Sequence, residues 1–173
     1  MRPQTIVLAV ALVAGSLLPA AAQPVAQTIA ILPGKTIGPI QIGMPLDRAK
    51  EIMAGWGTVE TVESAMGHGI CNPERGVGVC VFDRWDRLQL QAPGQVVFVL
   101  TDDPRFTTVP GGHKVGGPLL DLLRTFGLYS GGTETELLWE GHGLAADVRA
   151  TRAGLLVQFI GIYTPRTVAR RLP

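Results

Sequence analysis

A degenerate internal repeat becomes visible when the two halves of the chain are aligned, and it limits the folds open to this sequence. Leu-Pro-Gly at 32–34 is echoed by Val-Pro-Gly at 109–111, and Ile-Gly-Met-Pro-Leu at 42–46 is echoed by Val-Gly-Gly-Pro-Leu at 115–119. The second echo in each half opens a segment whose apolar residues have helical spacing. The pattern therefore predicts two copies of one unit that contains a helix.

Each predicted helix begins at a proline, Pro45 or Pro118, which suits the first turn because the amide there has no partner inside the helix. In the second helix the apolar residues recur at i, i+3, i+4 and i+7, and the first helix is a looser copy. We expect Gly57 and Gly127 to end the two helices. The apolar stripes consist of Leu46, Ala49, Ile52, Met53 and Trp56 in the first half and Leu119, Leu122, Leu123 and Phe126 in the second.

Alternating segments follow each helix and predict antiparallel strands, at 77–81, 88–90 and 96–100 in the first half and at 134–139, 144–151 and 155–163 in the second. We expect a turn at 83–86 and a hairpin turn at 152–154. Along 144–149, apolar residues alternate with Asp147 and Arg149, which predicts one packed face and one wet face. The predicted fold class is therefore α+β: two degenerate repeats, each a helix followed by antiparallel strands, with the helices on one face of the sheet.

This arrangement resembles the β-lactamase-inhibitor-protein-like fold, and the residues that carry the resemblance are Gly43 and Gly57, then Gly116 and Gly127. One unit also resembles the small outer-membrane assembly lipoproteins of the SmpA type, in which a short Gly-x-x motif opens the helix and a glycine ends it. The resemblance implies a bias toward protein binding and identifies no partner. The chain differs from those inhibitors in having one cysteine pair instead of one per half, and from the lipoproteins in lacking the lipid-bearing cysteine.

Residues 1–22 are predicted to be a signal peptide, with a positive start at Arg2, an apolar run at 5–18 and three alanines at 20–22 for the peptidase. The run is shorter than the roughly 20 residues of a membrane span, so we expect cleavage and no remaining membrane anchor. An uncleaved anchor helix is the alternative. The mature chain is predicted to consist of one repeat at 23–105 and another at 106–173, in a periplasmic or secreted location.

The two cysteines, Cys71 and Cys80, flank a segment dense in turn residues at 72–76. An oxidising compartment after export favours a disulfide between them across a hairpin. The spacing excludes a Cys-x-x-Cys redox centre, and a zinc site would need further ligands at regular intervals.

The charge balance argues against nucleic acid as a partner. The chain has 15 Lys and Arg against 14 Asp and Glu, and loss of Arg2 with the signal peptide makes the two equal. The only basic cluster in the sequence is Arg166, Arg170 and Arg171 near the carboxyl end, which we expect to be solvated.

The catalytic motifs that the sequence suggests are incomplete, and we predict that the chain is not an enzyme and has no cofactor. Gly34-Lys35-Thr36 resembles the end of a phosphate-binding loop, but Ile29 occupies the position of the first glycine. Ser64 and Ser130 are the serines after residue 22, and neither lies in a Gly-x-Ser-x-Gly motif.

We also considered a copper(I) site, because Met66 and His68 lie close to Cys71 in the sequence and the three are residue types that bind copper(I). Against it, a disulfide-bonded cysteine cannot ligate, and no spacing brings His113 or His142 near His68. We therefore assign no metal site.

The sequence favours an exported, non-catalytic module that binds another envelope or extracellular protein, with a small-molecule or metal-ion carrier as the alternative. An enclosed pocket would indicate a carrier, and an open patch with aromatic anchors would indicate a protein binder. The candidate binding residues belong to the sheet face turned away from the helices, with a tryptophan in the adjoining turn: Trp85, Gln89, Gln91, Asp147 and Arg149.

Overall fold

The computed structural model describes residues 28–64, 67–73 and 78–165, so the predicted signal peptide, Met66 and the basic cluster at the carboxyl end lie outside the described residues. No helix in the described ranges is long and apolar enough to span a membrane. The elements are β1 (Ile29–Leu32), β2 (Thr36–Ile37), β3 (Ile40–Gln41), α1 (Leu46–Ala54), β4 (Glu60–Ser64), β5 (Gly67–Cys71), β6 (Val79–Phe82), β7 (Arg84–Trp85), the 3₁₀ turn η1 (Asp86–Leu88), β8 (Leu90–Gln91), β9 (Phe98–Thr101), β10 (Phe106–Thr108), α2 (Leu119–Phe126), β11 (Gly131–Gly132), β12 (Glu136–Trp139), β13 (Leu144–Thr151) and β14 (Gly154–Tyr163).

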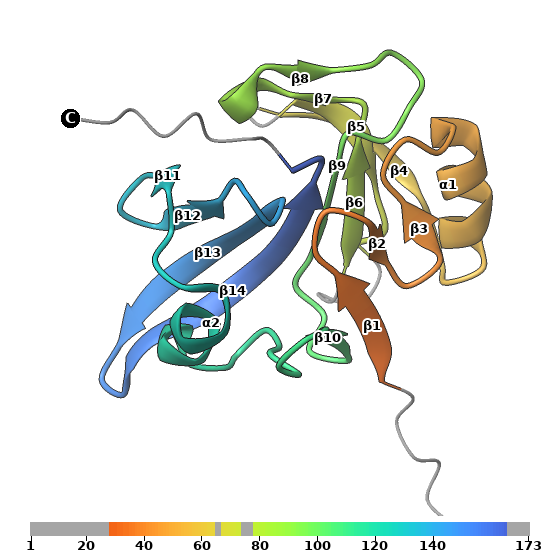
Figure 1. Cartoon of the computed structure of the whole chain (residues 1–173). Coiled ribbons are helices and arrows are strands. Elements are labelled where there is room, and N and C mark those ends of the chain that lie inside the picture. Colours follow the sequence, from red (N-terminus) through yellow and green to blue (C-terminus); the bar gives the residue numbers. More distant parts are fainter. Residues whose placement is uncertain (1–27, 65–66, 74–77, 166–173) are drawn as a thin grey trace, which may run out of the picture.

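The strands form one large sheet and two small ones (Figure 1). The large sheet is antiparallel, with the strand order β11-β12-β13-β14-β9-β6-β5-β4. A four-stranded sheet has the order β10-β1-β2-β3, in which β1 and β10 run parallel, and β7 pairs with β8 as a separate hairpin. The large sheet crosses the predicted repeat boundary at 105/106, because β9 from the first half pairs with β14 from the second.

This architecture contradicts the predicted α+β fold of two repeats, each a helix followed by antiparallel strands, because the chain is mostly β. Strands make up 45% of the described part of the chain and helix 15%. Three strands precede α1, and β1 takes its parallel partner from the second half of the chain. The first-half strands β1, β2 and β3 have two to four residues each, too few for alternation to reveal them.

The two helices themselves begin where the prolines predicted, at Leu46 after Pro45 and at Leu119 after Pro118. Helix α2 ends at Gly127, whose positive φ of 77° and amide bond to the Leu123 carbonyl make it the expected cap. Helix α1 ends earlier than predicted, at Ala54 with Gly55 as the cap.

One face of the large sheet carries the first core, which is closed by the helices and by the four-stranded sheet together. The small sheet is needed because each helix is short and covers only part of the sheet. The core includes Ile31, Ile37 and Ile40 from the small sheet, Ala49 and Met53 from α1, Leu119 and Leu122 from α2, and Val81, Val99, Ile160 and Ile162 from the large sheet.

The opposite face carries a second core, which corrects the expectation of a face left to water. Alternation along the strands sends Phe82, Phe98 and Leu138 to the side opposite their first-core neighbours. The β7–β8 hairpin lies over them, and Trp85 stacks on Phe98 with ring centroids 3.9 Å apart. The members of this core are Phe82, Trp85, Phe98, Leu100, Leu138, Ala145 and Tyr163.

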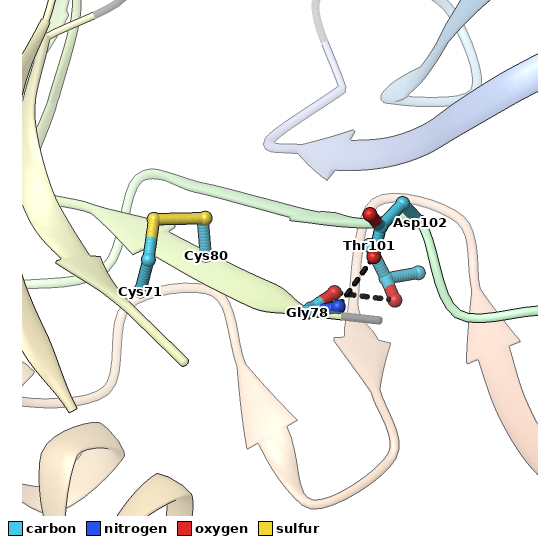
Figure 2. Close-up of a disulfide and its surroundings, with 5 residues drawn as sticks. All are labelled: Cys71, Gly78, Cys80, Thr101 and Asp102. Atoms are coloured by element: carbon cyan, nitrogen blue, oxygen red, sulfur yellow. Dashed lines mark hydrogen bonds between the residues drawn. A yellow bond between two sulfur atoms is a disulfide. The ribbon is translucent and has the colours of Figure 1, made fainter. Parts of the chain in front are cut away.

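The predicted disulfide joins Cys71 on β5 to Cys80 on β6 (Figure 2). The two residues face each other directly in the ladder, with Cα atoms 4.1 Å apart. The bond therefore links neighbouring strands across a hairpin, as the turn residues between the cysteines predicted.

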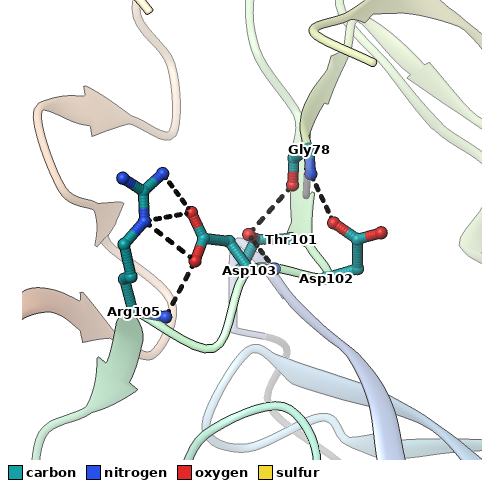
Figure 3. A network of polar contacts seen from close by, with 5 residues as sticks. All are labelled: Gly78, Thr101, Asp102, Asp103 and Arg105. Carbon is teal, nitrogen blue, oxygen red and sulfur yellow. Dashed lines mark hydrogen bonds and ion pairs between the residues drawn. The ribbon is translucent and has the colours of Figure 1, made fainter. Parts of the chain in front are cut away.

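A polar network fixes the turn that leads from β9 to β10 (Figure 3). Asp103 is 2% exposed and accepts hydrogen bonds from the Arg105 backbone amide at 2.8 Å and from its guanidinium at 2.5 and 2.8 Å. This pairing raises the pKa of Arg105. Thr101 Oγ1 donates to the Gly78 carbonyl at 3.0 Å, and Asp102 accepts from the Gly78 amide. The network stabilises the connection between β6, β9 and β10, because these groups satisfy one another.

Candidate functional site

Trp85, the predicted aromatic anchor, is not a surface residue. It lies in β7 with no exposed surface, inside the second core. Its ring is therefore unavailable to a partner, and the prediction of an exposed tryptophan beside the binding face is wrong. The sequence predicts a turn at 83–86, whereas the structure has the two-residue strand β7 followed by the 3₁₀ turn η1.

The two predicted glutamines are exposed but lie on the β7–β8 hairpin instead of on the large sheet. Gln89 follows η1 with a φ of 52°, in the left-handed region, so it ends the 3₁₀ turn. Gln91 pairs with Arg84 in the hairpin ladder. The expected strand at 88–90 is thus replaced by the end of a 3₁₀ turn and the start of β8.

Asp147 and Arg149 do lie on β13, as predicted, and they face the side of the second core. The strand register places Glu136 of β12 opposite Asp147, and Phe159 of β14 opposite Asp147 on its other side. These three side chains share one face. We call Glu136, Asp147 and Phe159 the acidic row. It borders the second core, since Leu138 and Ala145 lie two residues away along the same strands.

The acidic row combines an exposed aromatic ring with two carboxyl groups. Phe159 is 36% exposed. Arg87 of η1 reaches Glu136, with 2.7 Å between Nε and Oε2. Burial raises the pKa of Glu136, and the charge of Asp147 adds to this, although the charge of Arg87 opposes it. Asp147 Oδ1 is buried and accepts no hydrogen bond from any residue that the structure describes.

The sequence analysis missed Phe159 and Glu136 because of a β-bulge. The register between β13 and β14 shifts at Asp147/Val148, so Gln158 is an extra residue between the paired positions. Strict alternation along β14 would place Phe159 on the same side as the buried Val157, whereas the bulge sends it to the opposite face. Asp147 and Arg149 could be identified from the sequence because β13 keeps its regular alternation, while the extra residue lies on β14.

Gln91 lines a separate small hollow of about 180 Å³ together with His68, Asp83, Arg84 and Pro93. Asp83 accepts a hydrogen bond from His68 Nδ1 at 2.9 Å and another from the Gly94 amide at 3.0 Å. Burial opposes ionisation of Asp83, but these two hydrogen bonds and the charge of His68 outweigh it, and its pKa is lowered. Both carboxylate oxygens are thus used to hold the base of the β7–β8 hairpin.

The three histidines considered as copper ligands contact different residues. His68 is bound to Asp83, whereas His113 and His142 both lie edge-on to Phe126, with ring centroids 6.1 and 5.4 Å away. No group of three or more His, Cys, Asp and Glu residues that could hold a metal ion occurs within 28–64, 67–73 and 78–165.

No protein-family model matches the chain, and no curated protein matches it in sequence. Among solved structures, the chain is similar to the uncharacterized protein YfeY from Escherichia coli, with 14% sequence identity and a TM-score of 0.46, over 79% of this chain and 99% of that one. A likeness of this degree assigns neither a family nor a function.

Proposed function

We propose that this protein is an exported, non-catalytic binding module that uses the acidic row to recognise a basic segment of another envelope or extracellular protein. The observation that carries the proposal is the pairing of exposed Phe159 with Asp147, whose Oδ1 has no donor among the described residues. Asp147 as a whole is only half-buried, so a partner's cation can approach its carboxylate, whose charge no described donor to Oδ1 compensates, and gain a charge-assisted hydrogen bond.

The chemistry of the row suits an arginine or lysine. A guanidinium or ammonium group donates to the carboxylates of Asp147 and Glu136, and it is attracted by the ring of Phe159 as well. Burial has already removed part of the hydration of Glu136, which is 25% exposed at its side chain, so little further desolvation is needed. Arg149, next along the same face, favours an acidic or neutral residue beside the partner's cation.

The proposed location is the periplasm or the extracellular space. The Cys71–Cys80 disulfide fits an oxidising compartment. The amino-terminal segment at 1–22 has the composition of a signal peptide. Amino-terminal sequencing of protein from its own host should find Gln23 at or near the start, and an intact Met1 in the membrane fraction would contradict export by cleavage.

The experiment for the row is affinity capture from the host's envelope extract on the immobilised mature chain, with mass spectrometry and a measured Kd for the captured partner. We expect Asp147→Lys to weaken that Kd at least tenfold, because it places like charges together, and Phe159→Ala to weaken it about fivefold. Leu155→Ala is the matched control, since Leu155 is an exposed apolar residue of the same strand on the other face. Parental affinity in folded Asp147→Lys and Phe159→Ala variants would refute the proposal.

A further inference from the structure

A groove of about 390 Å³ lies between the loop at 111–117 and helix α2, and it is open to solvent on one side. Helix α2 packs on β14 on the face of the first core (Figure 1). The acidic row lies on the opposite face of the same sheet. The α2 groove is therefore a separate surface from the one that carries the proposed function.

The walls of the α2 groove are held in place by hydrogen bonds. The Gly116 amide donates to the Val157 carbonyl at 2.8 Å, and the Val157 amide donates to the Gly117 carbonyl at 2.9 Å. At the other end, His113 Nε2 lies 2.6 Å from Thr125 Oγ1 on α2. The loop is thus tied both to β14 and to the helix, so the groove is formed before anything binds in it.

Gly111 is required for this geometry. A Cβ atom at this position would lie 2.1 Å from His113 Nε2, and the φ of 100° is one that other residues rarely adopt. The absence of a side chain lets the imidazole of His113 lie across the loop and reach Thr125.

Basic side chains outnumber acidic ones in the lining of the groove. Leu122 and Val157, which line it, are buried in the first core. The loop wall contributes Lys114, which has no ion pair with any described residue, and the helix wall contributes Arg124. Arg124 pairs with Asp121 at 3.3 Å, but both side chains are exposed, at 70% and 42%, so the pair is weak. One acidic side chain thus faces two basic ones and a histidine.

We propose that the α2 groove is a second docking surface, which takes an extended acidic segment of a partner protein. A carboxylate of that segment lies between Lys114 on the loop wall and Arg124 on the helix wall, and the side chain that precedes it occupies the rest of the groove. An open groove favours an extended peptide over a small molecule, because small-ligand pockets enclose most of the ligand surface. The inference rests on the proposed function only in that the partner is a protein.

The test uses the mature chain and synthetic peptides, so it is independent of capture by the acidic row. Acetylated and amidated Ala-Ala-Leu-Glu-Ala-Ala is titrated while amide chemical shifts are followed by NMR, beside versions with Gln or Lys in place of Glu. We expect shifts at Lys114, Val157 and Thr125, and a Kd for the Glu peptide at least fivefold below that of the Gln peptide. Addition of 0.5 M NaCl should abolish this preference, because about 3 to 5 Å of screening length remains at such salt.

Variants locate the preference on the groove. Lys114→Ala combined with Arg124→Ala should bring the Glu and Gln peptides to the same Kd, while Arg152→Ala, an exposed cation in the β13–β14 turn, should leave the fivefold difference intact. Equal binding of the Glu and Gln peptides by the parent overturns the proposal, as does tighter binding of the Lys peptide. Shifts confined to the acidic row also overturn it. None of these results changes the outcome of partner capture, so failure here is distinguishable from failure of the proposed function.

Discussion

Replacing Asp83 by asparagine should destabilise the protein by about 2 to 3 kcal/mol at pH 7. The carboxylate is 12% exposed and accepts hydrogen bonds from the Gly94 amide and from His68 Nδ1. A hydrogen bond to a charged group stabilises by about 1.5 to 3 kcal/mol when it is buried. The bond to His68 counts for less, about 0.5 to 1 kcal/mol, because that side chain is 41% exposed and water competes for the interaction. Asparagine retains a single oxygen and cannot accept both bonds well.

The assay is urea-induced unfolding of the parent and of Asp83→Asn across a pH series. Since the pKa of Asp83 is lowered in the folded protein from the ordinary value of 3.8, its contribution is fully present above that value. It is lost as the pH falls through the lowered folded pKa. We therefore expect the parent to remain more stable than the variant from pH 7 down to about pH 5, and the difference to shrink below about pH 4.

Asp86→Asn is the matched control in the same hairpin. Its carboxylate lies 3.2 Å from Arg84 but is 53% exposed, so the change should stay within about 0.5 kcal/mol. A loss below about 0.5 kcal/mol for Asp83→Asn at pH 7, or a difference that persists unchanged at the acid end of the series, would refute the reasoning that Asp83 holds the hairpin through its charge.

Three further outcomes are expected. Replacing Cys71 and Cys80 together by serine should lower the free energy of unfolding by about 2 to 3 kcal/mol, since the disulfide spans nine positions, and denaturation curves with and without reductant check this. Trp85→Ala should lower the free energy of unfolding by about 3 to 5 kcal/mol because Trp85 is fully buried against Phe98. Gln89→Ala, on the exposed side of the hairpin, is the control and should lower it by less than about 1 kcal/mol. Equal effects of the two variants in thermal melts would contradict the position of Trp85 in the core. The pKa of Glu136 is raised on folding from its ordinary value of 4.5, so its ionised form costs stability above the folded pKa. The parent should therefore gain stability relative to Glu136→Gln as the pH falls through the folded pKa toward the ordinary value, and parallel pH profiles over that range would argue against the burial of that carboxyl.

The parts of the fold that depend on neighbouring residues could be predicted from the sequence. Pro118, the apolar stripe and Gly127 define α2 within a few residues of one another, and β13 has the predicted bounds of 144 and 151. The disulfide followed from two cysteines around a turn. These signals are local, so one segment of sequence contains all of each.

The remaining features depend on partners far away in the sequence. Ile29 of β1 pairs with Phe106 of β10, and nothing in either short segment specifies the other. The sequence places Trp85 in a turn beside the candidate face, and only the packing of the hairpin over Phe98 buries it. Phe159 became a candidate only through the bulge, which no alternation pattern reveals. The alignment of the two halves also led to the wrong architecture, since similar helix starts do not require similar sheets.

The parallel pairing of β1 with β10 also bears on how the chain reaches its native state. The first core includes Ile31 from the first strand and Phe106 from the tenth, so it cannot close until segments separated by most of the first half have met. Chains dominated by such distant pairings fold slowly, because the entropy of closing the long loop is lost before the contacts form. The hairpins β13–β14 and β4–β5 can form early, whereas the amino-terminal strand joins late. During that interval the exposed edge of β10 is open to the β1 segment of another molecule, which makes exchange of the amino-terminal strand between copies the characteristic folding error of this topology.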